Sequence, residues 1–187
     1  MFATSILSSF RFINSPTLTG EDYRLAQFHL HWGSGAKGTG SGAEGSEHTL
    51  EGRRYFAELH LVHYNTKYTD IGESLAHSDG LAVVGHFIEM VEDDPTNVAW
   101  SVENGWSTPW DNFIGSMVGD LKQPSETAAF GFDLAGLGLV DFGDYYRYKG
   151  SLTTPTCDEV VQWTVAKDTI KISQKTVEQM ISFTLVR

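Results

Sequence analysis

The stretch YRLAQFHLHW, from Tyr23 to Trp32, decides the fold together with YFAELHLVHY, from Tyr55 to Tyr64. Both stretches have the length of a strand and are rich in aromatic and other residues that favour strands. Side chains two positions apart on a strand lie on the same face of the sheet. The sequence therefore predicts two strands in which odd-numbered and even-numbered side chains lie on opposite faces of the sheet.

Parity determines the face of the strand on which each histidine lies. His29 and His31 share one face of the first strand, and His60 lies on one face of the second. If the two strands are neighbours in one sheet, three imidazoles converge. A catalytic zinc site uses three protein ligands and keeps one position open for water. The spacing therefore indicates a zinc site, and the alternative is a set of hydrogen-bonded histidines within a core.

Two further polar residues accompany these histidines. Gln27 and Glu58 each lie two positions before a histidine, on the same face. A histidine that binds a metal usually donates its other ring N–H to such an oxygen. A cupin also carries His-x-His on a strand, but it needs a glutamate a few residues later. The first acid after His31 is Glu44, beyond a glycine-rich loop, so a cupin fits poorly.

The rest of the chain predicts a mainly β (α+β) fold in a single domain over residues 1–187. Residues 33–45 read GSGAKGTGSGAEG and predict a flexible loop. No internal repeat and no second composition regime divides the chain. The further elements that we expect are a buried strand at 81–90, a strand at 159–166, a short helical turn at 74–77, a helix at 111–121 with Asp111 as its N-cap, and a helix at 177–183 leading into a final strand. Residues 129–140 are ambiguous.

Composition excludes several classes of function. The 187 residues include 24 acidic and 13 basic side chains, a net charge of −11. This charge argues against binding to nucleic acid or to an anionic membrane, both of which require basic surface. No apolar run approaches the ~18 residues of a membrane span. Cys157 is the single cysteine, so no disulfide forms within the chain, and a buried thiol in a reducing cytosol is the simplest interpretation.

Longer motifs carry a specific resemblance. In chain order they are FHLHWGS (28–34), GSEHTLEG (45–52), AELHLVHYNTKY (57–68), DGLAVVG (79–85) and SLTTPTCDEVVQWTV (151–165). Together they resemble the α-class carbonic anhydrases, over a region from about Pro16 to the end of the chain. The resemblance implies a large, twisted, mostly antiparallel sheet with a few short surface helices.

The resemblance also implies a catalytic centre. His29, His31 and His60 match the three Zn²⁺ ligands, and Gln27 and Glu58 match the residues that orient them. Zinc in this family lowers the pKa of its bound water to about 7. The resulting hydroxide hydrates carbon dioxide reversibly to bicarbonate and a proton.

Two residues are implied to direct that hydroxide. Thr153 matches the hydroxyl that accepts a hydrogen bond from it, and Glu47 matches the acid that receives the threonine's own proton. With its proton committed to Glu47, Thr153 can only accept from the zinc ligand.

The implied substrate pocket is apolar, with Thr154 at its mouth, and sulfonamide-type inhibitors are expected to bind there. Its wall consists of Val62, Val83, Leu152, Val161 and Trp163. His48 and His63 match structural positions near the site, whereas surface or packing roles are expected for His77 and His86. Tyr148 matches a tyrosine that joins Glu58 and His48, and simple core packing is its alternative.

The chain is shorter than the family's catalytic domain at both ends, so we expect a fragment of a longer protein. A degenerate member, or a site completed by another chain, are the alternatives. The missing parts would hold the proton-shuttle histidine and the backbone carbonyl that orients the residue matching His31.

TPTCDE resembles the secreted and membrane-anchored members, in which the residue matching Cys157 pairs with an N-terminal cysteine. An extracellular or secretory location is therefore expected, with the cytoplasm as the alternative. The alternative function is a non-catalytic module that binds a partner or an extracellular matrix.

Overall fold

A mixed sheet built around two long central strands positions everything else in the molecule. The computed structural model describes residues 2–6, 11–12, 21–33, 45–91, 109–120, 127–129, 137 and 143–185. The strands are β1 (Phe2–Ile6), β2 (Arg11–Phe12), β3 (Tyr23–Trp32), β4 (Ala57–Asn65), β5 (Leu81–Val91), β6 (Thr127–Ala129), β7 (Tyr145–Gly150), β8 (Val161–Ala166) and β9 (Ile170–Ser173). The helices are α1 (Ile71–Ser74), α2 (Pro109–Asp120) and α3 (Gln174–Leu185).

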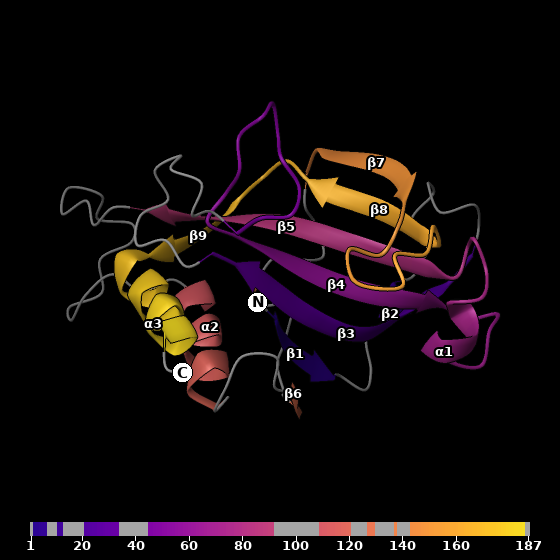
Figure 1. Cartoon of the computed structure of the whole chain (residues 1–187), viewed down its shortest axis with the longest axis horizontal. Coiled ribbons are helices and arrows are strands. Elements are labelled where there is room, and N and C mark those ends of the chain that lie inside the picture. Colours follow the sequence, from indigo (N-terminus) through magenta and orange to yellow (C-terminus); the bar gives the residue numbers. More distant parts are fainter. Residues whose placement is uncertain are drawn as a thin grey trace.

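The described strands form one sheet in the order β6-β1-β3-β4-β5-β8-β7 (Figure 1). In addition, β2 pairs with β3, and β9 pairs with β5. The pairs β1–β3, β2–β3, β3–β4, β4–β5 and β7–β8 are antiparallel, whereas β1–β6, β5–β8 and β5–β9 are parallel. The mainly β class and the mostly antiparallel sheet are therefore confirmed.

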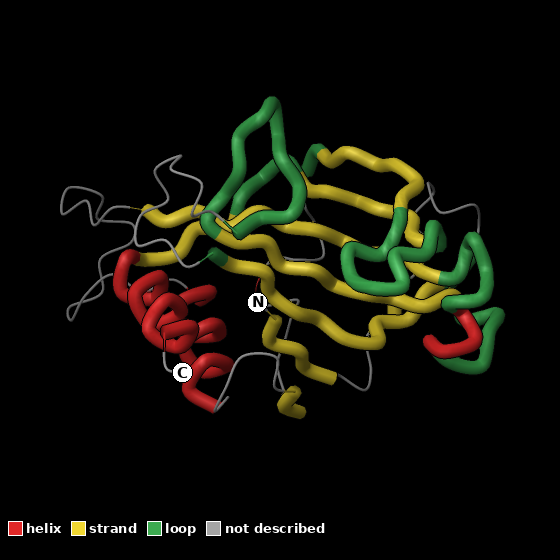
Figure 2. Tube along the Cα trace, viewed as in Figure 1, coloured by secondary structure: helices red, strands yellow, loops and turns green. Residues whose placement is uncertain are grey.

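The main core lies on the face of the sheet opposite to the histidines. Phe28, Leu30, Leu59 and Leu61 alternate with the histidine positions and are almost fully buried. They pack in one cluster with Phe113, Ile114 and Met117 of α2 and with Val177, Met180 and Ile181 of α3. The two helices lie side by side (Figure 2). Because α2 and α3 cover this apolar face of β3 and β4, the three histidines lie on the opposite face of the sheet.

Several predicted boundaries need correction at the helices. The helix expected at 111–121 begins at Pro109, a residue suited to the first helical position because it lacks an N–H. Asp111 is therefore inside α2 and is not its N-cap. The short turn expected at 74–77 is α1, which begins after the N-cap Asp70 and ends at Ser74.

The expected final strand is wrong, because α3 continues to Leu185. The strand of this region, β9, precedes the helix instead. Ser173 caps α3, because its Oγ accepts from Thr176 N at 3.3 Å. Asp111 Oδ1 holds this cap in place by accepting hydrogen bonds from Ser173 N (2.8 Å), Ser173 Oγ (2.9 Å) and Thr176 Oγ1 (2.6 Å). This contact joins the two helices at one buried carboxylate.

Other predictions lie partly outside the described residues. Of the predicted loop 33–45, only Gly33 and Gly45 are described, and of the ambiguous segment 129–140, only 129 and 137. Within the described part of the chain, no helix combines the length and the apolar character needed to cross a membrane.

Candidate metal centre

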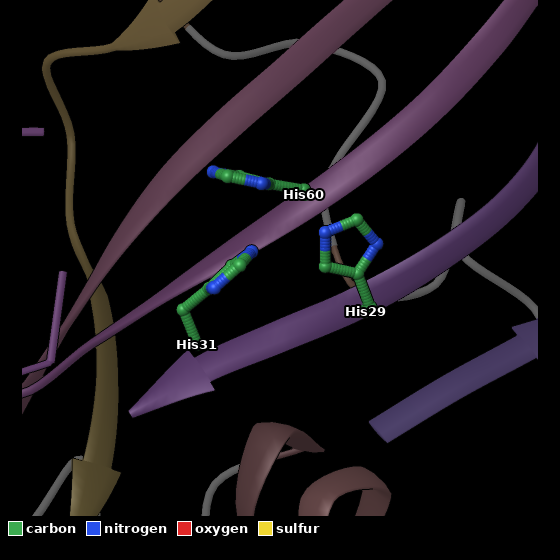
Figure 3. Close-up of side chains that lie close together, drawn as sticks. All are labelled: His29, His31 and His60. Carbon is green, nitrogen blue, oxygen red and sulfur yellow. The ribbon is translucent and has the colours of Figure 1, made fainter. Parts of the chain in front are cut away.

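The three histidines come together because β3 and β4 are adjacent and antiparallel. His29 is directly opposite His60 in the ladder, and His31 lies one pleat further along β3, opposite Glu58. The ring centroids are 4.9 Å apart for His29 and His31, 5.1 Å for His29 and His60, and 4.6 Å for His31 and His60. Figure 3 shows the three rings pointing toward one another from the two strands. One nitrogen of each lies within 4.8 Å of the others.

For two of the three rings, a hydrogen bond selects which nitrogen faces the cluster. His29 Nδ1 donates to Gln27 Oε1 at 3.0 Å, which leaves Nε2 as the ligand atom. His60 Nε2 donates to Glu58 Oε1 at 2.7 Å, which leaves Nδ1. These contacts use the two orienting residues that the sequence suggests. They also fix the tautomer that a metal requires.

Glu47 lies against the same cluster. Its Oε2 is 3.3 Å from His31 Nε2 and 3.9 Å from His60 Nδ1. This oxygen is buried and has no hydrogen-bond partner. The resemblance pairs Glu47 with Thr153, but in the structure the carboxylate turns toward the histidines, while Thr153 lines the neighbouring cavity. A carboxylate at this place provides a negative charge beside any cation that the histidines hold.

Glu58 is the hub of a buried network. Its Oε1 accepts from His48 Nδ1 at 2.5 Å as well as from His60, and its Oε2 accepts from the backbone N–H groups of Glu47 (2.9 Å) and His48 (2.8 Å). Burial raises the pKa of Glu58, but the hydrogen bonds from His48 and His60 outweigh it and hold the pKa well below its usual range. Glu58 is therefore an anion that keeps both imidazoles oriented.

The network continues to Tyr148, as expected. The Tyr148 hydroxyl donates to His48 Nε2, and its ring stacks on Trp163 with centroids 6.3 Å apart. Burial, together with the charges of Glu58 and Glu47, raises the pKa of Tyr148 to about 12, so the phenol stays protonated. The chain of donors runs from Tyr148 through His48 to Glu58.

Burial also keeps two of the clustered imidazoles neutral. Burial and the neighbouring His60 together lower the pKa of His29 to about 3 and that of His31 to about 2. A metal binds the neutral imidazole, because a protonated ring has no free lone pair. At neutral pH His29 and His31 are therefore in the form that binds a metal.

The remaining histidines have structural positions. His63 Nδ1 donates to the Ala82 carbonyl at 3.3 Å, and burial lowers the pKa of His63 to about 4. His86 is buried as well, so it packs inside the protein and is not at the surface. His77 stacks on the ring of Tyr68, with centroids 4.0 Å apart.

A cavity of about 440 Å³ opens beside His29 and His60. Four of the five predicted wall residues line it, namely Val62, Val83, Leu152 and Trp163, together with Thr153 and Thr154. Val161 does not line the cavity but packs behind it, in the same apolar cluster as Val62 and Val83. That one position of the predicted wall is therefore corrected.

Sequence reasoning missed part of the cavity and one close contact. Ile71 and Leu75 project into the cavity from α1 and the residue that follows it, and their i, i+4 spacing was the available signal. Gly85 is opposite His60 on β5, where a Cβ would lie 3.0 Å from Glu58 Oε1 and 3.8 Å from His60 Cδ2. Nothing local in the sequence marks this glycine, because the crowding comes from the neighbouring strand.

Cys157 lies in the loop after Thr154 and is exposed. Its N–H donates to the Thr154 carbonyl at 2.8 Å, which holds the loop close to the cavity. Since the chain has one cysteine, the predicted disulfide and the extracellular location of the parent protein stay predictions.

Comparison with known proteins agrees with this architecture. The profile of the eukaryotic-type carbonic anhydrases matches residues 4–185. Carbonic anhydrase 6 from Bos taurus is 37% identical over 176 residues, which are 94% of this chain and 50% of that protein. The chain thus spans about half the length of the curated relative that it matches. With nearly the whole chain covered by the family profile, the protein belongs to the eukaryotic-type carbonic anhydrase family.

Proposed function

We propose that this chain binds Zn²⁺ through His29, His31 and His60 and catalyses the reversible hydration of carbon dioxide. The observation that carries the proposal is the convergence of three imidazoles, two of which have their other nitrogen engaged by Gln27 and Glu58. Membership of the carbonic anhydrase family supports the same chemistry.

The donor set fits zinc. Imidazole nitrogens suit Zn²⁺, whereas Mg²⁺ and Ca²⁺ prefer oxygen ligands. A tetrahedral ion with Zn–N bonds of about 2.0–2.1 Å places its nitrogens about 3.3 Å apart. The three ligand atoms lie within 4.8 Å of one another, so small side-chain rotations bring them to that separation. Neutral ligands also leave the full divalent charge on the ion.

Zinc, when bound, supplies the Lewis acidity that makes water a nucleophile near neutral pH. The protein's own residues then direct the reaction. In the zinc-bound protein the Thr153 hydroxyl would donate its hydrogen bond to Glu47, which would leave Thr153 able only to accept a hydrogen bond from the attacking oxygen. That restriction aims the oxygen's lone pair at the substrate.

The cavity supplies a place for the substrate. Val62, Val83, Leu152 and Trp163 offer an apolar wall to carbon dioxide, which has no hydrogen-bond donor to satisfy. Thr154 lies on the lining and gives bicarbonate a polar contact as it leaves. A sulfonamide group would compete for the same space.

The experiment measures zinc stoichiometry and carbon dioxide hydration for the purified chain and for two variants. His60→Ala removes a ligand, and His77→Ala removes a histidine outside the site. We expect one zinc per chain and hydration above the buffer background for the parent and for His77→Ala, with both lost in His60→Ala. Added imidazole buffer should raise the rate, because the chain offers no identified proton shuttle. Zinc binding without turnover in the parent chain would reject the enzyme and favour the non-catalytic module.

A further inference from the structure

A short segment that precedes β4 leads two residues to the candidate metal centre. Ser46 N–H donates to the Tyr55 carbonyl at 3.1 Å, so the segment begins as a partner of the chain that enters β4. The next two N–H groups, those of Glu47 and His48, donate instead to Glu58 Oε2 at 2.9 and 2.8 Å. The segment therefore changes its hydrogen-bond partner immediately after Ser46, from backbone to a buried carboxylate.

The side chain of Ser46 lies at this change of partner. Ser46 is 1% exposed. Its Oγ donates to the His48 carbonyl at 2.8 Å and accepts from the Tyr55 N–H at 2.9 Å. The first of these bonds spans Glu47, because it joins a side chain to the backbone two residues later. One buried hydroxyl thus closes a turn around Glu47 and ties that turn to the backbone just before β4.

The backbone of Ser46 is held from both sides. Arg54 Nη1 donates to the Ser46 carbonyl. Gly45 lies so close to the end of β3 that a Cβ on it would overlap the backbone of Trp32 and Gly33. The surrounding fold therefore fixes the place of the Ser46 hydroxyl.

The turn that Ser46 closes contacts the metal centre by two routes. Glu47 Oε2 is 3.3 Å from His31 Nε2. Glu58, whose Oε2 accepts from the N–H groups of the turn, also accepts from His60 Nε2 at 2.7 Å. A displacement of the turn would therefore reach two of the three histidines.

We propose that Ser46 is a positioning residue of this centre. Its hydroxyl sets the place of Glu47 and, through Glu58, the orientation of the His60 ring. The consequence for catalysis rests on the proposed function, whereas the positioning is a property of the zinc-free chain. Ser46→Ala would leave the buried Tyr55 N–H without its acceptor and open the turn.

The first measurement is the imidazole N–H signal of His60 in the NMR spectrum of the zinc-free full chain, labelled with ¹⁵N-histidine. Its loss in His60→Ala assigns it. We expect Ser46→Ala to move the signal upfield, because the bond to Glu58 lengthens. The matched control Ser74→Ala removes another buried serine hydroxyl, which donates to the Asp70 carbonyl at 3.0 Å, and it should leave the signal in place. An unmoved signal in folded Ser46→Ala would overturn the proposal.

The second measurement is zinc affinity, by competition with a chromophoric chelator. We expect Ser46→Ala to bind zinc about tenfold more weakly and Ser74→Ala to match the parent chain. At saturating zinc, kcat for carbon dioxide hydration should fall about tenfold with KM within about twofold, because Glu47 is displaced. Zinc affinity and kcat that are equal in Ser46→Ala and the parent would leave the serine a stabilising role alone and reject the proposal.

A second variant and the zinc-free measurement keep the two proposals apart. If the parent chain does not hydrate carbon dioxide, the proposed function fails, while the His60 signal in the zinc-free chain still decides the role of Ser46. If Ser46→Ala does not fold, Arg54→Met takes its place, because it removes the contact to the Ser46 carbonyl from an exposed position. The same directions are then expected, and an unchanged His60 signal in this variant would contradict the positioning role.

Discussion

An imidazole can give a metal only one nitrogen, and at this centre the residue two positions earlier decides which one. Gln27 holds Nδ1 of His29, and Glu58 holds Nε2 of His60, so the two rings offer different atoms to the same point. The difference follows from their places on opposed strands, since the rings approach from opposite sides. At the scale of single residues, orientation is thus built before any ion arrives.

The buried histidines predict how stability depends on pH in the zinc-free chain. Burial lowers the pKa of His63 and of His86 to about 4, from an ordinary value of 6.5. Between these values the unfolded state binds protons that the folded state does not, so the free energy of unfolding falls as the pH falls. We expect a loss on the order of 1 kcal/mol per pH unit for each histidine, measured by urea unfolding at pH 7 and pH 5. His86→Gln should reduce the slope, and an unfolding free energy that is equal at both pH values would contradict the prediction.

A single added methyl group tests the crowding behind His60. In Gly85→Ala the new Cβ would lie 3.0 Å from Glu58 Oε1 and displace the carboxylate that orients the ring. We expect zinc affinity to fall about 10- to 100-fold, measured by competition with a chromophoric chelator. The control is Gly115→Ala in α2, where the Cβ meets only the end of the Gln179 side chain at 3.4 Å. A comparable loss of affinity in both variants would argue against a specific role for Gly85.

At the scale of elements, local periodicity was enough to predict the position of some strands and helices but not of others. The strand at Tyr23–Trp32 and the parity of its histidines follow from its own residues, and the structure has these bounds. The start of α3 also has a local signal, because Ser173 precedes the helix and its Oγ accepts from Thr176 N at 3.3 Å. The contact of Ser173 with Asp111 on α2, 62 residues away, has no local signal. β9 was missed because its four residues gain their strand character from pairing with β5. Long-range partners decide such features.

Asp111 makes this dependence measurable. Asp111→Ala would leave Ser173 N–H, Ser173 Oγ and Thr176 Oγ1 without their buried acceptor. We expect the free energy of unfolding to fall by about 2–4 kcal/mol. In hydrogen exchange, the amides of α3 should lose protection before those of the other elements. Ser116→Ala, at an exposed position of α2, serves as the control. If both variants unfold at the same urea concentration, the contact of Asp111 with Ser173 and Thr176 does not stabilise the fold.

For the whole molecule, the candidate metal centre lies on β3 and β4 inside the sheet, whereas β7 lies at one end of the strand order. The convergence of the three histidines could be predicted from the sequence because it depends on one pair of strands, but the surroundings of Glu47 could not. That side chain is placed by a segment that is distant in the chain from His31. The predicted pairing of Glu47 with Thr153 stays a prediction for the zinc-bound protein.

Zinc should stabilise the whole fold if it binds the native state alone. At a free concentration of about 100 times its Kd, linkage predicts about 2.7 kcal/mol. For a chain of this length we expect the Tm to rise by about 5–10 °C, measured by calorimetry with zinc and after chelation. His60→Ala should show no such rise, and an equal rise in that variant would place the ion elsewhere.

The positions of β3 and β4 in the strand order have a mechanical consequence. Among the described strands, β1, β2 and β6 lie outside β3 on one side, and β5, β7, β8 and β9 lie outside β4 on the other. A force that peels the sheet from either margin must therefore detach those neighbours before it loads the pair that bears the histidines. An ion gripped between the two strands would act as a clamp at the last point to give way.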